Sequence, residues 1–343
     1  MRWDEQRVEN DLRLPGVGDG AVVRTFDAPE AMGINFHEVR ARSALNHVPG
    51  GRYGFSYTVN PYRGCTHACV FCFARKSHTY LGLDAGRDFE REIVVKVNVP
   101  ELLRAELARP SWGRELVALG TNTDPYQWVE GRYRLMPEIL AALEEAGTPV
   151  SVLTKSPLAM RDVEIFERMA RKLPVSVNLS VPTLDEDAWR ATEPHTPSPS
   201  ARLDAVTELR RRGIDSGVLI APLMPGINDS PDQVRPIIER ARKAKASFLG
   251  GMAPHLRGEV KDVFFAWLQA KRPDLIPSYE QLYARGRGYM KPDDRKQAAR
   301  AVRGWGQGRG RRSPEPTDTQ SRPQAGLSER GTAAPGPTQP RLF

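Results

Sequence analysis

Short β-branched apolar runs alternate with longer stretches of helical periodicity between about residue 51 and residue 290. A short apolar run suits a strand that is buried on both faces, and the amphipathic stretch after it suits a helix that covers one face of a sheet. Parallel strands need such crossover helices to connect them. The alternation therefore predicts an α/β domain built on a parallel sheet.

Six apolar runs are expected to form the main strands of this sheet. In chain order they are 55–59, 116–119, 150–153, 175–179, 217–221 and 247–249. The helices expected after them cover 137–146, 161–172, 200–212, 231–245 and 259–270, and an additional strand and helix are expected over 93–97 and 100–109. Six such units can form either an open doubly wound sheet or an incomplete barrel, and in both folds ligands bind at the carboxyl ends of the strands.

The two ends of the chain lack this alternation. Residues 1–50 mix charges, glycines and short apolar groups, so we expect an N-terminal arm or cap on a core domain that covers 51–290. A C-terminal helix is expected over 291–303. Residues 304–343 hold 7 glycines, 6 prolines and few large apolar groups, which predicts a disordered tail because too little apolar surface is available to offset the entropy of ordering.

Charge is distributed unevenly along the 343 residues. The chain carries 50 Lys and Arg against 42 Asp and Glu, a net charge of +8, and its 40% of apolar residues can form a large core, which excludes a pure low-complexity binder. From Arg285 to Phe343 there are 13 basic and 5 acidic residues, so residues 1–284 hold 37 of each. The basic end could follow the phosphates of a nucleic acid while Trp305 stacks on a base, or it could be a solvated helix and tail.

No segment approaches the roughly 20 apolar residues that span a bilayer, and the opening residues lack the apolar core of a signal peptide, so we expect a cytoplasmic protein.

All three cysteines, Cys65, Cys69 and Cys72, lie within eight residues, which indicates a metal or redox site in such a chain. Three thiolates can hold three irons of a cubane, whereas electron carriers with [4Fe–4S] clusters use four cysteines. The fourth iron would then be open to water, a substrate or a cofactor.

Two other interpretations of the cysteine loop are open. Structural zinc could take the three cysteines and one histidine, chosen from His37, His47, His67 and His78. Such sites usually pair two ligand hooks, and this chain has one. The protein would then be a zinc-binding module that presents its basic end to nucleic acid without catalysis. Three unliganded buried cysteines are the remaining alternative.

The spacing Cys65-x-x-x-Cys69-x-x-Cys72, with Phe71 before the third cysteine and a predicted strand before the loop, resembles the cluster motif of the radical SAM superfamily. The sequence Asn-Pro-Tyr-Arg-Gly-Cys at 60–65 resembles the spore photoproduct lyase-like branch, especially its uncharacterised members. Further similarity lies in 120–127, 154–156 and 221–226.

This resemblance, which covers about 51–290, implies an incomplete (β/α)6 barrel of the TIM type and a [4Fe–4S] cluster whose open iron binds S-adenosyl-L-methionine. Reductive cleavage of that cofactor yields a 5′-deoxyadenosyl radical, which takes a hydrogen atom from the substrate. The resemblance thus implies a radical SAM enzyme, a lyase or an enzyme of other radical chemistry, that depends on a reductant such as a flavodoxin or ferredoxin. Its substrate stays open, with nucleic acid as one possibility.

The resemblance also implies where the cofactor is held. The candidate contacts are Phe71, Thr121, Asn122, Thr123, Lys155, Ser156, Asn178 and Ser180. Phe71 is expected near the adenine, the residues after the second strand at the methionyl amine, those after the third at the carboxylate or the substrate, and those after the fourth at the ribose. Two of these contacts have ordinary alternatives: residues 121–123 could form only a polar turn, and Lys155 could be a solvated lysine at a strand end.

The sequence predicts no hydrogen donor or other catalytic residue. Photoproduct lyases use a cysteine outside the cluster and a tyrosine directly after the third cluster cysteine, but this chain has no fourth cysteine and carries Phe73 at that position. Repair of thymine dimers by that route is therefore not expected. Tyrosines that could substitute are Tyr57, Tyr62, Tyr80 and Tyr126. His255 follows the sixth strand and is either an ordinary surface-loop residue or a substrate contact.

Overall fold

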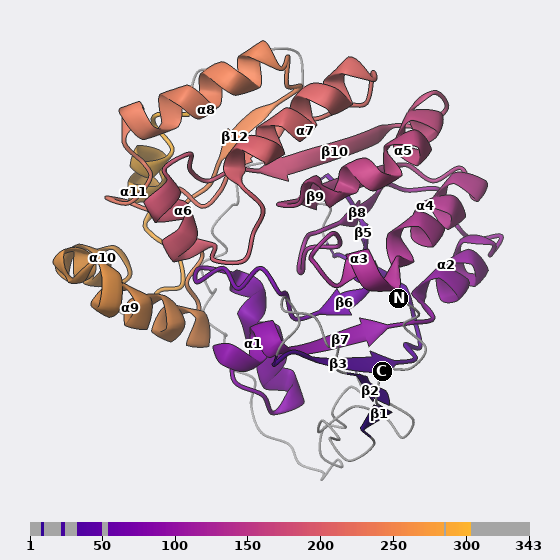
Figure 1. The fold of residues 1–343 in the computed structure, drawn as a ribbon, viewed down its shortest axis with the longest axis horizontal. Helices are drawn as coiled ribbons and strands as arrows, with labels where there is room; N and C mark the ends of the chain where they lie inside the picture. Colours follow the sequence, from indigo (N-terminus) through magenta and orange to yellow (C-terminus); the bar gives the residue numbers. More distant parts are fainter. Residues whose placement is uncertain (1–7, 10–21, 25–32, 50–53, 285, 303–343) are drawn as a thin grey trace, which may run out of the picture.

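The computed structural model describes residues 8–9, 22–24, 33–49, 54–284 and 286–302. These residues form two sheets, helices that cover the outer face of the larger sheet, and a group of C-terminal helices beside it (Figure 1). The tail expected over 304–343, with Trp305, lies outside the described residues.

The main sheet has seven strands in the order β12-β11-β10-β9-β8-β5-β4. They are β4 (Leu45–His47), β5 (Tyr57–Val59), β8 (Val117–Leu119), β9 (Val150–Thr154), β10 (Val175–Ser180), β11 (Val218–Ile220) and β12 (Leu249–Gly251). The six from β5 to β12 pair in parallel, and β4 pairs antiparallel to β5. Along the sheet, the six parallel strands follow one another in the same order as in the chain, and this order never reverses as it would in a doubly wound fold. The six strands therefore form an incomplete (β/α)6 barrel.

Helices lie between the main strands and after β12 much as the periodicity predicts. They are α2 (Val99–Leu107), α4 (Leu135–Glu145), α5 (Val163–Ala170), α7 (Pro199–Arg211), α8 (Pro231–Lys243) and α9 (Glu259–Lys271). Helix α8 begins at a capping box in which Ser230 and Gln233 satisfy each other's backbone amides, with Pro231 at the first position. Helix α5 starts later than predicted because Pro157–Asp162 forms a 3-10 turn, η4, capped by the Ser156 side chain.

Strand β12 lies two residues later than the predicted run 247–249. The end of β8 shows how tightly the main strands pack. Gly120 has a positive φ of 82°. A Cβ atom at this position would overlap the carbonyl oxygen of Leu153 in β9, so only glycine fits. The chain that leaves β8 can thus turn directly over β9.

The smaller sheet has the order β1-β2-β3-β7-β6. Its strands are β1 (Val8–Glu9), β2 (Val22–Arg24), β3 (Asn35–Val39), β6 (Tyr62–Arg63) and β7 (Glu92–Lys96). The additional predicted strand 93–97 is β7, which pairs in parallel with β3. Part of the predicted N-terminal arm is thus built into both sheets, since β3 joins the smaller one and β4 the barrel.

The remaining elements surround the cysteine loop and the C-terminal side. They are η3 (Phe73–Leu81), α1 (Arg87–Arg91), α3 (Glu130–Tyr133), α6 (Glu186–Thr192), η5 (Pro273–Leu275), α10 (Ile276–Leu282) and α11 (Pro292–Ala298). Helix α6 lies between the predicted strand 175–179 and the predicted helix 200–212, and α11 lies within the predicted C-terminal helix. In the part of the chain that the structure describes, no helix is both long and apolar enough to cross a membrane.

Two large apolar clusters hold this arrangement. One fills the space between the barrel strands and their helices, with Val59, Leu119 and Val177 fully buried. The other joins Cys69 and Phe71 of the cysteine loop to the C-terminal helices. The cysteine loop is therefore packed between the barrel and those helices.

Candidate active site

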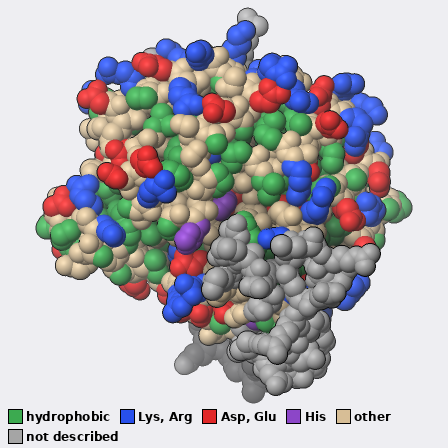
Figure 2. All heavy atoms as spheres, viewed as in Figure 1, with side chains coloured by type: hydrophobic (Ala, Val, Ile, Leu, Met, Phe, Trp, Pro, Cys, Tyr) green, Lys and Arg blue, Asp and Glu red, His purple; other side chains and the backbone are tan. Residues whose placement is uncertain are grey.

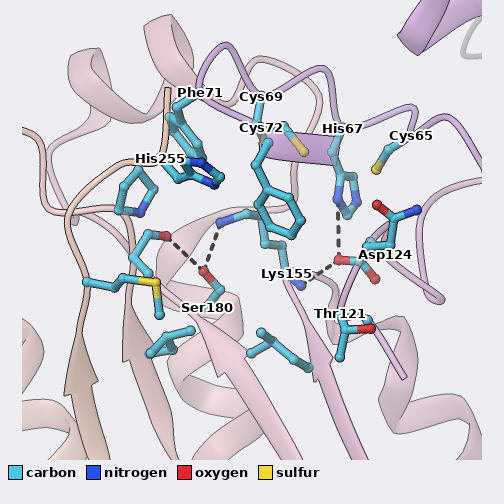
Figure 3. Close-up of a pocket in the computed structure, with 18 of the residues that line it drawn as sticks. Cys65, His67, Cys69, Phe71, Cys72, Thr121, Asp124, Lys155, Ser180 and His255 are labelled. Atoms are coloured by element: carbon cyan, nitrogen blue, oxygen red, sulfur yellow. Dashed lines mark hydrogen bonds and ion pairs between the residues drawn. The ribbon is translucent and has the colours of Figure 1, made fainter. Parts of the chain in front are cut away.

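The cysteine loop connects β6 to η3, and its three cysteines border a single cavity of about 240 Å³. All three are free thiols; Cys65 and Cys69 are buried and Cys72 is partly exposed. Burial raises the pKa of each thiol. Figure 3 shows the cysteines on one side of this space and Thr121 and Ser180, from the strand ends, on the other.

Arg75 braces this loop from behind. Its buried guanidinium donates hydrogen bonds to the carbonyl oxygens of Cys69 and Ala68, both at 2.9 Å, and of Ala85 at 3.0 Å. Glu90, 3.3 Å away, is its carboxylate partner. Because its rigid planar guanidinium binds several backbone carbonyls at once, Arg75 fixes the conformation of the cysteine loop.

Gln127 braces the other end of the loop. Its buried side-chain amide donates to the Gly64 carbonyl at 3.0 Å and accepts from the Thr66 amide at 2.8 Å. These two bonds flank Cys65 on both sides. The position of the first cysteine is therefore fixed relative to the chain that follows β8.

Asp124 connects the loop to the strand ends. Its carboxylate accepts from the Thr154 hydroxyl at 2.6 Å and from the Lys155 amide at 2.7 Å, and lies 3.4 Å from Nδ1 of His67. Burial lowers the pKa of His67, and the neighbouring carboxylate partly offsets that shift. Asp124 and His67 both border the cavity, which places a polar pair between the cysteines and β9.

Lys155 projects into the cavity at the end of β9. Its ammonium donates to the Ser180 hydroxyl at 2.8 Å, lies 2.5 Å from Oε1 of Glu193, and sits 5.5 Å from the centre of the Phe71 ring. The other carboxylate oxygen of Glu193 pairs with the buried Arg202 at 2.8 Å. Burial raises the pKa of Glu193, but Arg202 and Lys155 together outweigh it and hold that pKa below its usual value. One carboxylate therefore lies between two cations.

The structure brings five of the eight predicted contacts to the cavity: Phe71, Thr121, Asn122, Lys155 and Ser180. The other three do not border it, because their polar atoms are bound elsewhere. Thr123 donates to the Tyr62 carbonyl, the Ser156 hydroxyl caps η4, and the Asn178 side chain bonds Gly217 and Ser176.

Several residues of the cavity were not predicted as contacts. They are His67, Asp124, Leu219, Ala221, Pro222, Met252, Ala253 and Pro254. Position after β8 is the signal that could have identified Asp124, since it directly follows the three candidates at 121–123. His255, left open from the sequence, also borders the cavity. None of the four candidate tyrosines does, and Tyr62 and Tyr126 instead donate to buried carboxylates, those of Glu130 and Asp162.

The described residues contain no group of three or more His, Cys, Asp or Glu side chains arranged around a single metal position. The three cysteines instead border a shared space that is otherwise lined mostly by apolar side chains and strand-end polar groups. Sulfur donors on one side and a lysine with a serine on the other suit a ligand that carries both a metal-binding group and an anionic group.

Comparison with known proteins agrees with this arrangement. Residues 59–241 match the family model described as the Radical SAM superfamily. An uncharacterized protein of Mycobacterium tuberculosis is 45% identical over 303 residues, which cover 86% of this chain and 89% of that protein.

Solved structures share the fold. Spore photoproduct lyase complexed with dinucleoside spore photoproduct aligns with a TM-score of 0.59 and 16% identity over 82% of both chains. A double mutant of spore photoproduct lyase with bound AdoMet and dinucleoside spore photoproduct aligns with a TM-score of 0.57 and 16% identity, over 78% of this chain and 77% of that one.

Proposed function

This chain belongs to the radical SAM superfamily, and on that premise we propose that it cleaves S-adenosyl-L-methionine reductively at a [4Fe–4S] cluster held by Cys65, Cys69 and Cys72. The observation that carries the proposal is the single cavity bordered by all three cysteines and by the ends of the barrel strands. When bound, the cluster and cofactor supply a one-electron cleavage of the C5′–S bond that yields methionine and a 5′-deoxyadenosyl radical.

The donor set fits the cluster. Three thiols on one braced loop can each bind one iron, and no other cysteine in the sequence competes for the fourth. Because burial disfavours the thiolates, loading must release their protons, and iron supplies the positive charge that stabilises the anions. Arg75 adds a fixed cation behind Cys69.

The polar residues at the strand ends would orient the cofactor. Lys155 is placed to pair with the methionyl carboxylate, because its ammonium lies in the cavity and is held by Ser180 and Glu193. In this proposal Thr121 and Asn122 bind the methionyl amine and Phe71 contacts the adenine, which is supported by the position of all three at the cavity. The apolar lining from Leu219, Ala221 and Pro222 would keep water from a reactive radical.

We propose a nucleic acid as the substrate class and a low-potential electron carrier such as a flavodoxin or ferredoxin as the reductant. The basic C-terminal region supports the first, since it holds the whole net charge of the chain. The spore photoproduct lyase that shares this fold was solved with a dinucleoside spore photoproduct, which supports the same class. The reaction differs from the cysteine-dependent photoproduct lyase route, because the chain has no cysteine beyond the cluster set.

The test is anaerobic reconstitution followed by reduction with dithionite in the presence of S-adenosyl-L-methionine. We expect about four irons per chain and formation of 5′-deoxyadenosine, measured by mass spectrometry. A fully loaded cluster that yields none contradicts the proposal. One zinc and no iron in anaerobically purified protein would favour the zinc-binding module instead.

A further inference from the structure

Two aromatic rings stack at the edge of the cavity. The His255 imidazole and the Tyr289 phenol ring are nearly parallel, at 8°, with their centres 3.8 Å apart. His255 borders the cavity, and Tyr289 is 50% exposed. The two rings therefore lie face to face and form a stacked pair, called here the aromatic wall; its His255 side borders the cavity and its Tyr289 side reaches solvent.

The backbone fixes this pair in place. The Leu256 amide donates to the Gly288 carbonyl at 2.9 Å, which joins the segment of His255 to that of Tyr289. The two segments approach so closely that a Cβ atom on Gly288 would lie 2.7 Å from the Cβ of Arg257. Glycine at this position allows the contact, and the aromatic wall is therefore preformed.

Exposed apolar side chains continue the wall around the opening. Phe73 is 52% exposed and Met252 is 59% exposed, and both border the cavity. Large apolar groups kept in contact with water around a cavity mark a ligand site. Their flat and flexible surfaces suit a planar aromatic ligand.

Two arginines lie near the aromatic wall. Arg295 lies 5.9 Å from the centre of the Tyr289 ring, and Arg257 is exposed next to His255. Residues 286–302 hold five basic and two acidic side chains, and one of the acidic ones, Asp293, is 3.6 Å from Lys296. In Figure 2, Lys and Arg side chains alternate with Asp and Glu around the periphery of the face, with apolar side chains nearer its centre, so the positive excess comes from residues 286–302. The charge favours an anionic ligand.

We propose that His255 and Tyr289 form a stacking platform for one nucleobase of a single-stranded nucleic acid, while Arg257, Lys291 and Arg295 contact its phosphates. A base within a duplex is stacked on both sides, so it reaches such a wall only when it is unpaired or flipped out. The inference rests on the proposed function, since it names how the substrate meets the cavity that the cysteines border.

Binding of a short fluorescein-labelled single strand to the full-length, cluster-loaded protein tests the platform. Fluorescence anisotropy is recorded anaerobically without reductant, so that no turnover occurs. Tyr289→Ala should weaken binding by about tenfold, the usual scale for loss of one base stack, and His255→Ala should weaken it similarly. Tyr289→Phe, which keeps the ring, should bind like the wild type. Tyr80→Ala is the matched control, because Tyr80 is 64% exposed and does not border the cavity.

A salt series separates stacking from charge. Lys291→Gln and Arg295→Gln should each make the negative slope of log K against log salt concentration shallower by about 0.7. Tyr289→Ala should leave this slope unchanged. Three outcomes would overturn the proposed platform. Both alanine variants could bind the strand as tightly as the wild type, the protein could bind the matched duplex more tightly than the single strand, or polyglutamate could compete as well as an unlabelled strand. Failure of the proposed function would show separately, as wild-type protein that binds the strand yet forms no 5′-deoxyadenosine.

Discussion

The two sides of the cavity are built on different principles. The cysteine side is buried, and its backbone is satisfied by the polar side chains of Arg75 and Gln127. The rim of the opening, by contrast, exposes Phe73, Met252 and Tyr289 to solvent. Buried hydrogen-bonded groups fix a geometry, whereas exposed apolar groups tolerate different ligands. Under the proposed function, the cysteine side would hold the cofactor and the exposed rim would select the substrate.

The largest effect is expected from Cys69→Ala, which removes one of the three proposed cluster ligands. Cluster loading should be abolished while the barrel stays folded, because the main apolar core does not include this loop. Iron content and far-ultraviolet circular dichroism measure the two outcomes. A molten variant would show that Cys69 also supports the packing of the C-terminal helices.

Glu193→Gln should be the next most severe change, because it leaves Lys155 and Arg202 without their shared carboxylate. We expect the free energy of unfolding to fall by about 3 to 5 kcal/mol and the affinity for S-adenosyl-L-methionine to decrease. Urea unfolding and calorimetry measure these effects.

The same variant has a pH dependence. The pKa of Glu193 in the folded protein lies below its usual value, so its contribution to stability is present above about pH 4.3 and is lost as the pH falls through the folded value. The stability difference between wild type and Glu193→Gln should therefore narrow on acidification. A difference that widens would show that the carboxyl is protonated in the folded protein.

Arg75→Met tests the brace behind the cysteines. The buried carbonyls of Cys69 and Ala68 would lose their donors, at a cost of about 1 to 3 kcal/mol each. We expect a lower melting temperature and faster loss of iron to a chelator. Arg190→Met on α6 is the control, since Arg190 is exposed and contacts only side chains of its own helix, the Glu186 carboxylate and the Trp189 ring, among the described residues. Equal effects of the two variants would contradict the bracing role.

A paired comparison of Ser180→Ala and Ser156→Ala has the smallest expected effect. Ser180 bonds Lys155 in the cavity, so its loss should weaken cofactor binding severalfold, on the order of 1 kcal/mol. Ser156 caps η4, so its loss should cost about 1 kcal/mol of stability and leave cofactor affinity unchanged. Calorimetric titration distinguishes them, and equal affinities would remove Ser180 from the cofactor site.

The barrel strands could be predicted because each is a short buried run followed by an amphipathic helix, and the comparison with spore photoproduct lyase agrees with the resulting fold. Strand β12 shifted because 247–249 is brief and leads into two glycines, which carry no pattern. Helix α6 was missed because it is a short element, Glu186–Thr192, within a long connection.

The candidate site could likewise be predicted only in part from the sequence. Lys155 and Ser180 were found because they end strands, and position along the chain is a local property. Position does not fix side-chain direction, which is why Thr123, placed by the same rule, turns away to bond the Tyr62 carbonyl. Glu193 reaches Lys155 from a separate loop, and such a distant partner leaves no trace in local periodicity.

The packing of the cysteine loop against the C-terminal helices has a consequence for biogenesis. Cys69 and Phe71 share an apolar cluster with Phe264, Tyr279 and Tyr283, which are synthesised much later. A nascent chain on the ribosome presents the three thiols long before their packing partners emerge. If the cysteines hold the proposed cluster, we expect its stable insertion only once the chain through Tyr283 has been synthesised and packed against the loop.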